Sequence, residues 1–357
     1  MEHASPHLAR LAREPRPAGS TAAAGARAYC ANVLRAAGFD ISEQEFEYSR
    51  FPGAWSMPIA GVGASLGAIL LYLGRQVPWL AVAGGLLVVL VVAGVAWLGG
   101  RGVLGFPVAR RRGVNLQAVR GGGDPPVWLV AHIDSKWQPV SMVARVAGVI
   151  GTAAGLIVLA ALALARSSAA DTVAAATLML TWVFAAPLVL SIAEARNTGA
   201  LDNASGVCAV LEAVESLPAT ARVGVLITDA EEMALAGALA WARGRAPSVA
   251  LNCDSVDDHG TLTVMYSRSR PAALVSQLEG AARIHGERLR VLRLIPGVLT
   301  DSVALANAGW KAVTLSHGDL RTLQRIHTAG DTLATLRGTG IASAARILAH
   351  TAMELGG

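Results

Sequence analysis

The sequence predicts an α/β domain, built on a mostly parallel central sheet flanked by helices, that is interrupted by two transmembrane helical hairpins. Short apolar runs alternate with helical patterns over most of the chain, which is typical of a parallel sheet covered by helices. Four long uncharged stretches fall into two pairs, as expected for membrane spans. The composition agrees, because 53% of the residues are hydrophobic and only 15% are charged, which is too apolar for an ordinary soluble enzyme.

The first soluble segment, residues 1–56, is expected to open with a helix. Ser20 can cap an Ala-rich helix that runs to Ala37, and Gly38 ends it. A strand-like stretch follows from Ile41 to Tyr48. The N-terminal residues are polar and charged and lack the apolar centre of a signal peptide, so we expect no cleaved leader.

Two hairpins then separate the soluble segments. The first hairpin, residues 57–100, contains spans at 57–74 and 77–98, and the second, residues 141–194, contains spans at 146–165 and 172–193. Each span is long enough to cross a hydrocarbon core of about 30 Å. A buried core helix rarely stays uncharged over such a length, so we expect four transmembrane helices in contact with the lipid bilayer.

The basic residues predict the orientation of this integral membrane protein. Those on the side of the soluble segments are Arg101, Arg110, Arg111, Arg112, Lys136, Arg145 and Arg196. The hairpin loops contain only Arg75 and Arg166. The positive-inside rule therefore places the soluble domain in the cytoplasm.

The three soluble segments, residues 1–56, 101–140 and 195–357, are expected to form one domain. Strands are predicted at Val127–Val130, Val223–Thr228, Val249–Asn252 and Ala312–Ser316. A helical pattern at Met233–Arg243 follows the second of these strands. Ligand sites in such sheets gather beyond the carboxyl ends of the strands.

Charge and cysteine usage exclude two classes of protein. The net charge is +5, but the arginines are mostly scattered among acids and aromatic residues are few, so no nucleic-acid partner is expected. Cys30, Cys208 and Cys253 lie far apart and form no CxxC pair. This spacing argues against a disulfide framework and fits a reducing compartment.

Five short segments carry side chains that can bind a metal. They supply His132 with Asp134, Asp202, Glu231 with Glu232, Asp254, and His327 with Asp331. Zinc takes imidazole nitrogen and carboxylate oxygen, and a pair of zinc ions needs a bridging carboxylate, two histidines and two further carboxylates. The chain contains this inventory, whereas any one of these residues alone would be unremarkable as a helix cap or a loop residue.

The arrangement of these segments resembles the M28 family of zinc-dependent aminopeptidases. The matching pieces are AHIDS at 131–135, GALDNASGV at 199–207, ITDAEE at 227–232, LNCDSV at 251–256 and RIHTAGDT at 325–332. Their order and their position at strand ends fit the family, and the resemblance covers nearly all the soluble sequence. It implies a hydrolase that removes N-terminal residues from peptides with a free N-terminus.

The resemblance also implies which residues hold two Zn²⁺ ions. Asp202 would bridge the ions. His132 and Asp254 would complete the site of one ion, and Glu232 and His327 that of the other.

Two further residues receive catalytic roles from the same resemblance. Glu231 would be the general base, which takes a proton from the attacking water and delivers it to the leaving amine. Asp134 would accept a hydrogen bond from the far nitrogen of His132 and fix its tautomer.

Two departures from the family pattern stand out. The stretch Thr300-Asp301-Ser302 replaces the usual Ser-Asp-His, and the residues from Pro296 to Leu299 contain no Tyr that could stabilise an oxyanion. The second hairpin lies between Ser135 and Asn197, two pieces of the predicted site, so the site is expected close to the bilayer surface.

Other functions remain open at this point. Relatives of the glutaminyl cyclase type use one zinc ion for acyl transfer, and a non-catalytic membrane receptor could keep an intact metal site. Retention of every ligand position and of Glu231 favours the two-metal hydrolase. A coupled transporter is disfavoured because no ionisable residue lies deep in a predicted span.

Overall fold

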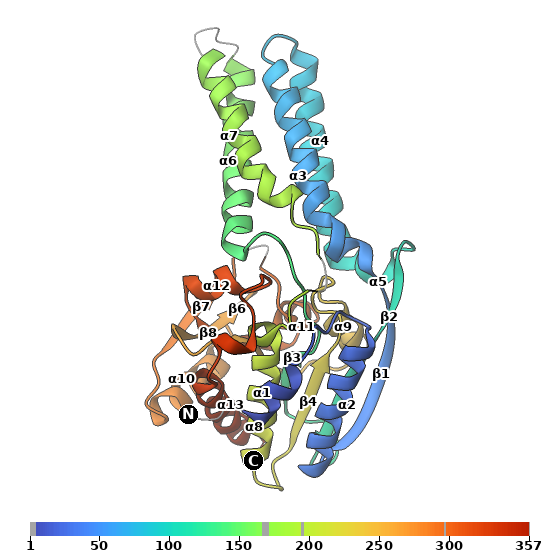
Figure 1. Ribbon diagram of the computed structural model, residues 1–357, viewed down its shortest axis with the longest axis vertical. Coiled ribbons are helices and arrows are strands. Elements are labelled where there is room, and N and C mark those ends of the chain that lie inside the picture. Colours follow the sequence, from blue (N-terminus) through green and yellow to red (C-terminus); the bar gives the residue numbers. More distant parts are fainter. Residues whose placement is uncertain (1–4, 166–170, 194–195, 296–297, 357) are drawn as a thin grey trace. The chain divides into compact units, whose positions relative to one another are not determined.

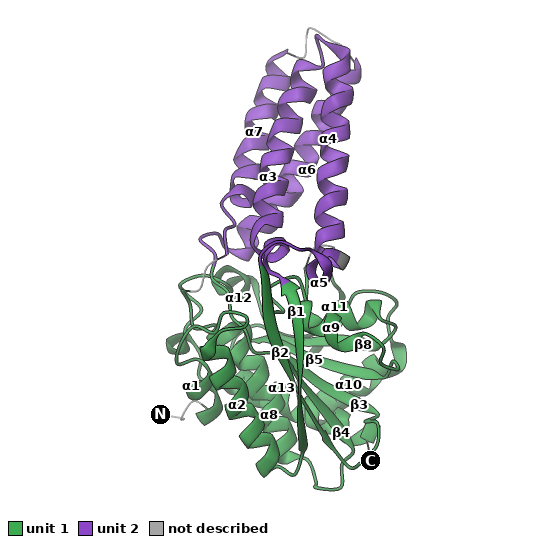
Figure 2. Ribbon diagram, turned by 90° about the vertical axis from the view of Figure 1, so that its right-hand side faces the viewer, with its two compact units in different colours: residues 1–48, 110–137, 195–357 green, residues 49–109, 138–194 purple. Residues whose placement is uncertain are grey.

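A computed structural model describes residues 5–165, 171–193, 196–295 and 298–356 of the chain. The chain divides into two compact units (Figure 2). Unit 1 comprises Met1–Tyr48, Arg110–Trp137 and Ala195–Gly357, and unit 2 comprises Ser49–Ala109 and Gln138–Glu194. Some predicted features lie outside the described residues, namely Arg166 in the second hairpin loop, the boundary between residues 194 and 195, and Pro296 with Gly297.

Unit 1 is built on an eight-stranded sheet with the order β1-β2-β4-β3-β5-β8-β6-β7. The strands are β1 (Asp40–Ser49), β2 (Arg110–Arg120), β3 (Val127–His132), β4 (Val223–Thr228), β5 (Val249–Val256), β6 (Thr261–Tyr266), β7 (Leu289–Arg293) and β8 (Lys311–Gly318). The central strands β4, β3, β5 and β8 pair in parallel, while β2 pairs with β4 and β6 with β8 in the antiparallel sense. The expected α/β sheet is therefore confirmed, and it is mixed toward its edges.

Four of the five strands that the sequence predicts are the central ones, which are buried on both faces. The fifth, predicted at Ile41–Tyr48, corresponds to the edge strand β1. All six residues of β3 and all six of β4 are buried, and such strands read as continuous apolar runs. The prediction included no strand corresponding to β2, β6 or β7. In β7, for example, Arg290 and Leu292 are exposed, so the apolar run that identified the central strands is missing.

Helices cover both faces of the sheet (Figure 1). One face packs against α1 (Pro6–Leu11), α2 (Thr21–Ala36), α8 (Ser205–Ser216), α10 (Ala272–Ile284) and α13 (Thr339–Gly356). The other face packs against α9 (Ala236–Ala242) and α11 (Asp301–Asn307). Successive residues of β3 point to opposite faces, so Leu129 joins the first core and Trp128 the second.

The starts of α2 and α9 differ in how well the local sequence predicts them. The hydroxyl of Ser20 accepts a hydrogen bond from the N–H of Ala23 at 3.1 Å, which confirms the predicted cap of α2. The helix expected at Met233–Arg243 is shorter, because Ala234 and Leu235 have φ values of 62° and 61°, outside the helical region. Helix α9 therefore begins at Ala236.

Unit 2 contains four long helices, α3 (Arg50–Leu73), α4 (Pro78–Trp97), α6 (Met142–Ala165) and α7 (Asp171–Val189). A π-helical turn, Leu98–Gly102, and the short α5, Val103–Gly105, follow α4. Each of the four is long and apolar enough to cross a membrane. Gly84 is the one buried residue of α4. Many of the large apolar side chains of α4 are exposed, among them Trp79, Leu86 and Leu90.

Glycines allow close approach inside unit 2. A Cβ added at Gly155 of α6 would lie 2.0 Å from the Thr181 hydroxyl of α7, and one at Gly151 would lie 2.2 Å from the Phe184 ring. Small residues at helix contacts are common in membrane bundles, where dispersion contacts replace the hydrophobic effect as the main attraction.

Candidate metal centre

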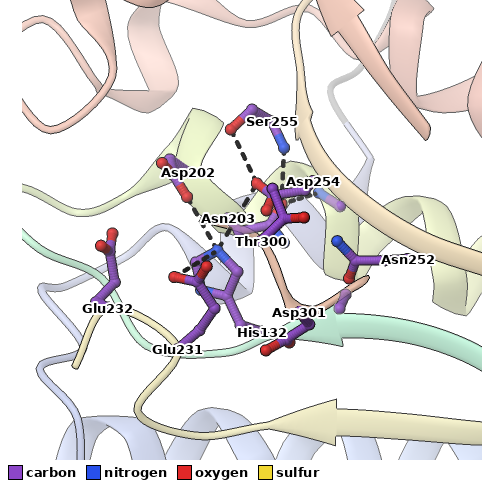
Figure 3. A network of polar contacts seen from close by, with 12 residues as sticks. His132, Asp202, Asn203, Glu231, Glu232, Asn252, Asp254, Ser255, Thr300 and Asp301 are labelled. Atoms are coloured by element: carbon purple, nitrogen blue, oxygen red, sulfur yellow. Dashed lines mark hydrogen bonds and ion pairs between the residues drawn. The ribbon is translucent and has the colours of Figure 1, made fainter. Parts of the chain in front are cut away.

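The candidate donors come from segments far apart in the chain and meet near the carboxyl ends of the central strands, and Figure 3 shows all of them except His327. His132 ends β3, Asp254 lies in the last part of β5, and Glu231 follows the end of β4. Asp202 lies in the kinked turn Ala200–Ala204 that precedes α8, and its own backbone is extended rather than helical, with φ −120° and ψ 94°. His327 follows α12 (Leu320–Arg325).

Asp202 lies between two imidazoles. Its Oδ1 atom is 3.0 Å from Nε2 of His132, and its Oδ2 atom is 3.0 Å from Nε2 of His327. Each carboxylate oxygen thus faces a different histidine. A carboxylate that bridges two metal ions needs this arrangement.

The candidate donors form two groups, and Asp202 belongs to the second of them. Donor atoms of His132, Glu231 and Asp254 lie within 4.8 Å of one another, and so do those of Asp202, Glu232 and His327. We call them the His132 group and the His327 group. The His132 group thus includes Glu231, the expected general base, whose Oε2 atom lies 4.0 Å from Nε2 of His132.

The geometry of these groups fits zinc. Imidazole nitrogens and carboxylate oxygens are zinc ligands, and every member of both groups is buried. Glu232 Oε1 lies 2.7 Å from Nε2 of His327. A carboxylate oxygen and an imidazole nitrogen this close together can both contact one ion.

Crowding of carboxylates perturbs the acid–base properties of the His132 group. Burial, together with the charges of Glu232 and Asp254, raises the pKa of Glu231 well above its ordinary value. Burial also raises the pKa of Asp254, despite its contact with His132. Burial alone would lower the pKa of His132, but Glu231 and the other neighbouring carboxylates raise it well above the usual range. Such a site favours an added positive charge.

Asp134 lies beside His132, as the prediction of a contact between them requires. Nδ1 of His132 lies 3.1 Å from the main-chain carbonyl oxygen of Asp134 and 3.6 Å from its carboxylate. The carboxylate also accepts hydrogen bonds from the main-chain N–H groups of Glu231 at 3.0 Å and Glu232 at 3.2 Å. Asp134 therefore also holds the chain that follows β4.

Asp331 has a comparable role on the other side of the site. Its carboxylate accepts hydrogen bonds from the N–H groups of Leu201 at 2.6 Å and Asp202 at 3.2 Å. The sequence singled out Asp331 as a possible donor to a metal. In the structure it fixes the main chain that presents Asp202.

Asp301 lies next to these donors at the start of α11 (Figure 3). It is fully buried, it accepts a hydrogen bond from the Thr228 hydroxyl, and burial raises its pKa to about 7. By its sequence, the stretch from Pro296 to Leu299 contains no Tyr that could stabilise an oxyanion. The described part of this stretch, Val298 and Leu299, has no hydroxyl group.

Lys136 is the site residue that sequence reasoning missed. Its Nζ atom lies 2.6 Å from Oε2 of Glu232, and its side chain is only 11% exposed. The sequence offered one signal, because Lys136 follows the AHIDS motif directly and is one of only two lysines in the chain. It was interpreted only as part of the positive flank of a membrane span.

A comparison with models of protein families gives one match. Residues 170–352 match the model of peptidase family M28. No curated protein matches the chain significantly.

Solved structures share the fold at low sequence identity. An aminopeptidase from Aneurinibacillus sp. strain AM-1 superposes with a TM-score of 0.59 at 14% identity, covering 98% of this chain and 92% of that one. The zinc aminopeptidase BSAP from Bacillus subtilis has a TM-score of 0.59 at 13% identity, with coverages of 99% and 94%. The glutaminyl cyclase of Fimbriiglobus ruber has a TM-score of 0.57 at 15% identity, with coverages of 98% and 93%. At these identities the likeness is one of fold.

Proposed function

The chain belongs to peptidase family M28, and from this premise we propose that it is a membrane-anchored, two-zinc aminopeptidase that removes N-terminal residues from peptides. The observation that carries the proposal is Asp202, whose two oxygens each face a different imidazole at 3.0 Å. A single-ion site would need only one of these contacts.

The proposed ligands follow from the two donor groups. His132 and Asp254 would hold one zinc ion, Glu232 and His327 the other, and Asp202 would bridge them. When bound, the ions polarise the scissile carbonyl group and lower the pKa of water toward neutrality.

Glu231 would act as the general base. It takes a proton from the attacking water and transfers it to the leaving amine. Glu231 is 7% exposed, and the Asp134 carboxylate accepts a hydrogen bond from its main-chain N–H at 3.0 Å, so the side chain starts from a fixed position. A base held in place in this way needs little reorganisation in the transition state.

The proposed substrate is a peptide with a free N-terminus. A buried cluster of carboxylates favours a cationic ammonium group over a neutral, acetylated one. Peptides blocked at the N-terminus should therefore be poor substrates.

The test uses detergent-purified full-length protein and matched pairs of short peptides, free and N-acetylated. Release of the N-terminal residue should be lost on chelation, return with zinc, and be confined to the free peptides. Glu231→Gln should lower kcat by about 10²- to 10⁴-fold. Glu279→Gln, on α10 at the surface, is the matched control and should leave kcat unchanged. Full activity of the Glu231→Gln variant would exclude Glu231 as the base.

A second candidate function is acyl transfer of the glutaminyl cyclase type, favoured by the similar fold of the Fimbriiglobus ruber enzyme. Peptides with N-terminal glutamine distinguish the two functions, since cyclisation releases ammonia and leaves the peptide bond intact. A folded, zinc-loaded protein with neither activity would instead support a receptor that binds peptides at an intact metal site.

We further propose that unit 2 is the membrane anchor. In this arrangement residues 57–100 and 141–194 form two transmembrane hairpins, and residues 1–56, 101–140 and 195–357 form the peptidase domain. Four helices of sufficient length and apolarity support this assignment. The proposed active site would act at the membrane surface, on the cytoplasmic side according to the positive-inside rule. To test this topology, a reporter that works only outside the cytoplasm is fused after Gly357. Activity of this reporter would show that the domain lies on the opposite side.

A further inference from the structure

The two donor groups of the metal centre differ in their surroundings. In the His327 group, the Lys136 ammonium lies 2.6 Å from Oε2 of Glu232, while Oε1 of the same carboxylate lies 2.7 Å from Nε2 of His327. In the His132 group, the ion pairs that the described residues make with Glu231 and Asp254 come from His132 alone. Among the described residues, the His327 group therefore has a lysine ammonium beside it and the His132 group does not.

The position of Lys136 is fixed by its neighbourhood. It lies four residues after His132, which ends β3, so the sheet holds its main chain close to the site. Burial of both partners, at 11% and 4% side-chain exposure, limits screening of their charges by water. Lysine has three donors and no acceptor, so its ammonium can bind a carboxylate oxygen but cannot be a metal ligand while it is protonated.

Two physical effects of Lys136 act in the same direction. The ammonium repels a divalent ion held by the other oxygen of Glu232, and this repulsion is strong over a few ångströms in a buried site. The ammonium also occupies Oε2, which restricts Glu232 to binding an ion through Oε1. Both effects weaken the binding of a metal ion by the His327 group.

We propose that Lys136 is a positioning residue that makes the two metal sites unequal, by lowering the affinity of the His327 group for a divalent cation below that of the His132 group. The inference rests on the proposed two-metal function. It adds that one ion is held tightly and the other is exchangeable.

The test is a zinc titration of the metal-free, detergent-solubilised full-length protein against a chromophoric chelator. The wild type should show two binding constants, and Glu232→Gln should remove the weaker one. Lys136→Met should tighten the weaker constant by about 10- to 100-fold, the usual scale for partners of metal ligands. Lys136→Arg keeps the cation and should resemble the wild type.

Two further variants separate the local charge of Lys136 from the net charge of the protein and from misfolding. Lys311→Met removes the only other lysine, which is exposed at the start of β8, and should change neither constant. Lys136→Gln can still donate a hydrogen bond to Glu232 but is neutral, so it should also tighten the weaker constant. It serves as the second variant if Lys136→Met does not fold, as judged by circular dichroism.

The outcomes distinguish this inference from the function on which it rests. If the wild type binds two ions and the neutral variants leave the weaker constant unchanged or weaken it, the role of Lys136 is wrong while the two-metal site stands. Loss of the tighter constant in Glu232→Gln would likewise refute the inference. A folded wild type that binds no zinc would refute both.

Discussion

Strand β3 and helix α4 are both strongly apolar, yet they lie in opposite environments. Every residue of β3 is buried by the protein itself, whereas α4 has one buried residue, Gly84. The apolar side chains of α4, such as Leu86 and Leu90, are 59% and 68% exposed. A folded chain in water rarely leaves so long an apolar surface uncovered, so this difference supports the proposal that unit 2 is a membrane anchor.

The two units also differ in how they use polar groups. Unit 1 buries carboxylates and histidines that contact one another, as Asp202 does with His132 and His327. In unit 2, by contrast, Gly155 of α6 lies close to Thr181 of α7, and Gly151 of α6 lies close to Phe184 of α7. A buried cluster of charges is suited to chemistry, and a closely packed apolar bundle is suited to anchoring.

The largest expected effect comes from placing charge on α4. In Leu86→Arg/Leu90→Arg, two arginines near the bilayer centre would cost about 5–7 kcal/mol, taking about 2.5–3.5 kcal/mol for each. We expect the variant to be lost from the membrane pellet after an alkaline carbonate wash. The control is Ile284→Arg on α10, where the side chain is 66% exposed in unit 1 and the change should be tolerated. Normal membrane integration of the double variant would contradict the assignment of α4 as a span.

A core substitution in β3 should have the next largest effect. Leu129 is fully buried, so Leu129→Ala leaves a cavity and should lower the free energy of unfolding by about 2–5 kcal/mol. Leu90→Ala, on the exposed surface of α4, should lower it by less than about 1 kcal/mol in detergent, because little protein packing is lost. Chemical denaturation followed by tryptophan fluorescence measures both. Equal losses of unfolding free energy in the two variants would show that β3 and α4 do not differ in how far protein packing stabilises them.

The contact between α6 and α7 gives a smaller effect. In Gly155→Ala the added methyl group would lie 2.0 Å from the Thr181 hydroxyl, and we expect a loss of about 1–3 kcal/mol from overpacking. Gly85→Ala is the matched control on α4, since nothing lies within 4 Å of its added Cβ. Alanine is the better helix former, so this control should be neutral or more stable by up to about 1 kcal/mol. Thermal unfolding in detergent checks the pair, and a stable Gly155→Ala variant would show that the helices are not so close.

The smallest effect is expected at the start of α13. The carboxylate of Asp258 accepts hydrogen bonds from the N–H groups of Arg337, Gly338 and Gly340. Burial alone would raise the pKa of Asp258, but these hydrogen bonds outweigh it and lower the pKa below its ordinary value of 3.8. Folding therefore favours the ionised form, whose contribution is complete above pH 3.8 and is lost as the pH falls through the lower folded value.

Asp258→Asn should accordingly cost about 0.5–1 kcal/mol at pH 7, a value reduced for solvent screening at this partly exposed group. The difference from the wild type should shrink as the pH falls below 3.8 and through the lower folded pKa, because the native carboxyl group then becomes protonated. Chemical denaturation of both proteins at several pH values measures this difference in the free energy of unfolding. A difference that does not change with pH would mean that the charge of Asp258 contributes nothing.

Much of the fold could be predicted because local patterns reflect it directly. The central strand Val223–Thr228 has the same bounds in the prediction and in the structure, since burial on both faces makes it a continuous apolar run. The half-exposed strands β2, β6 and β7 lack that pattern. The start of α9 was misplaced because the positive φ values of Ala234 and Leu235 depend on surrounding structure.

The sequence by itself determined the identity and order of the candidate donors, because short motifs at strand ends place His132, Glu231 and Asp254 on one edge of the sheet. Only the tertiary structure decided how these side chains pair. It sets Asp202 between His132 and His327, turns the Asp134 carboxylate to the main chain of Glu231 and Glu232, and brings Lys136 to Glu232. These contacts join segments far apart in the chain, and their distances depend on packing in three dimensions, which no local pattern encodes.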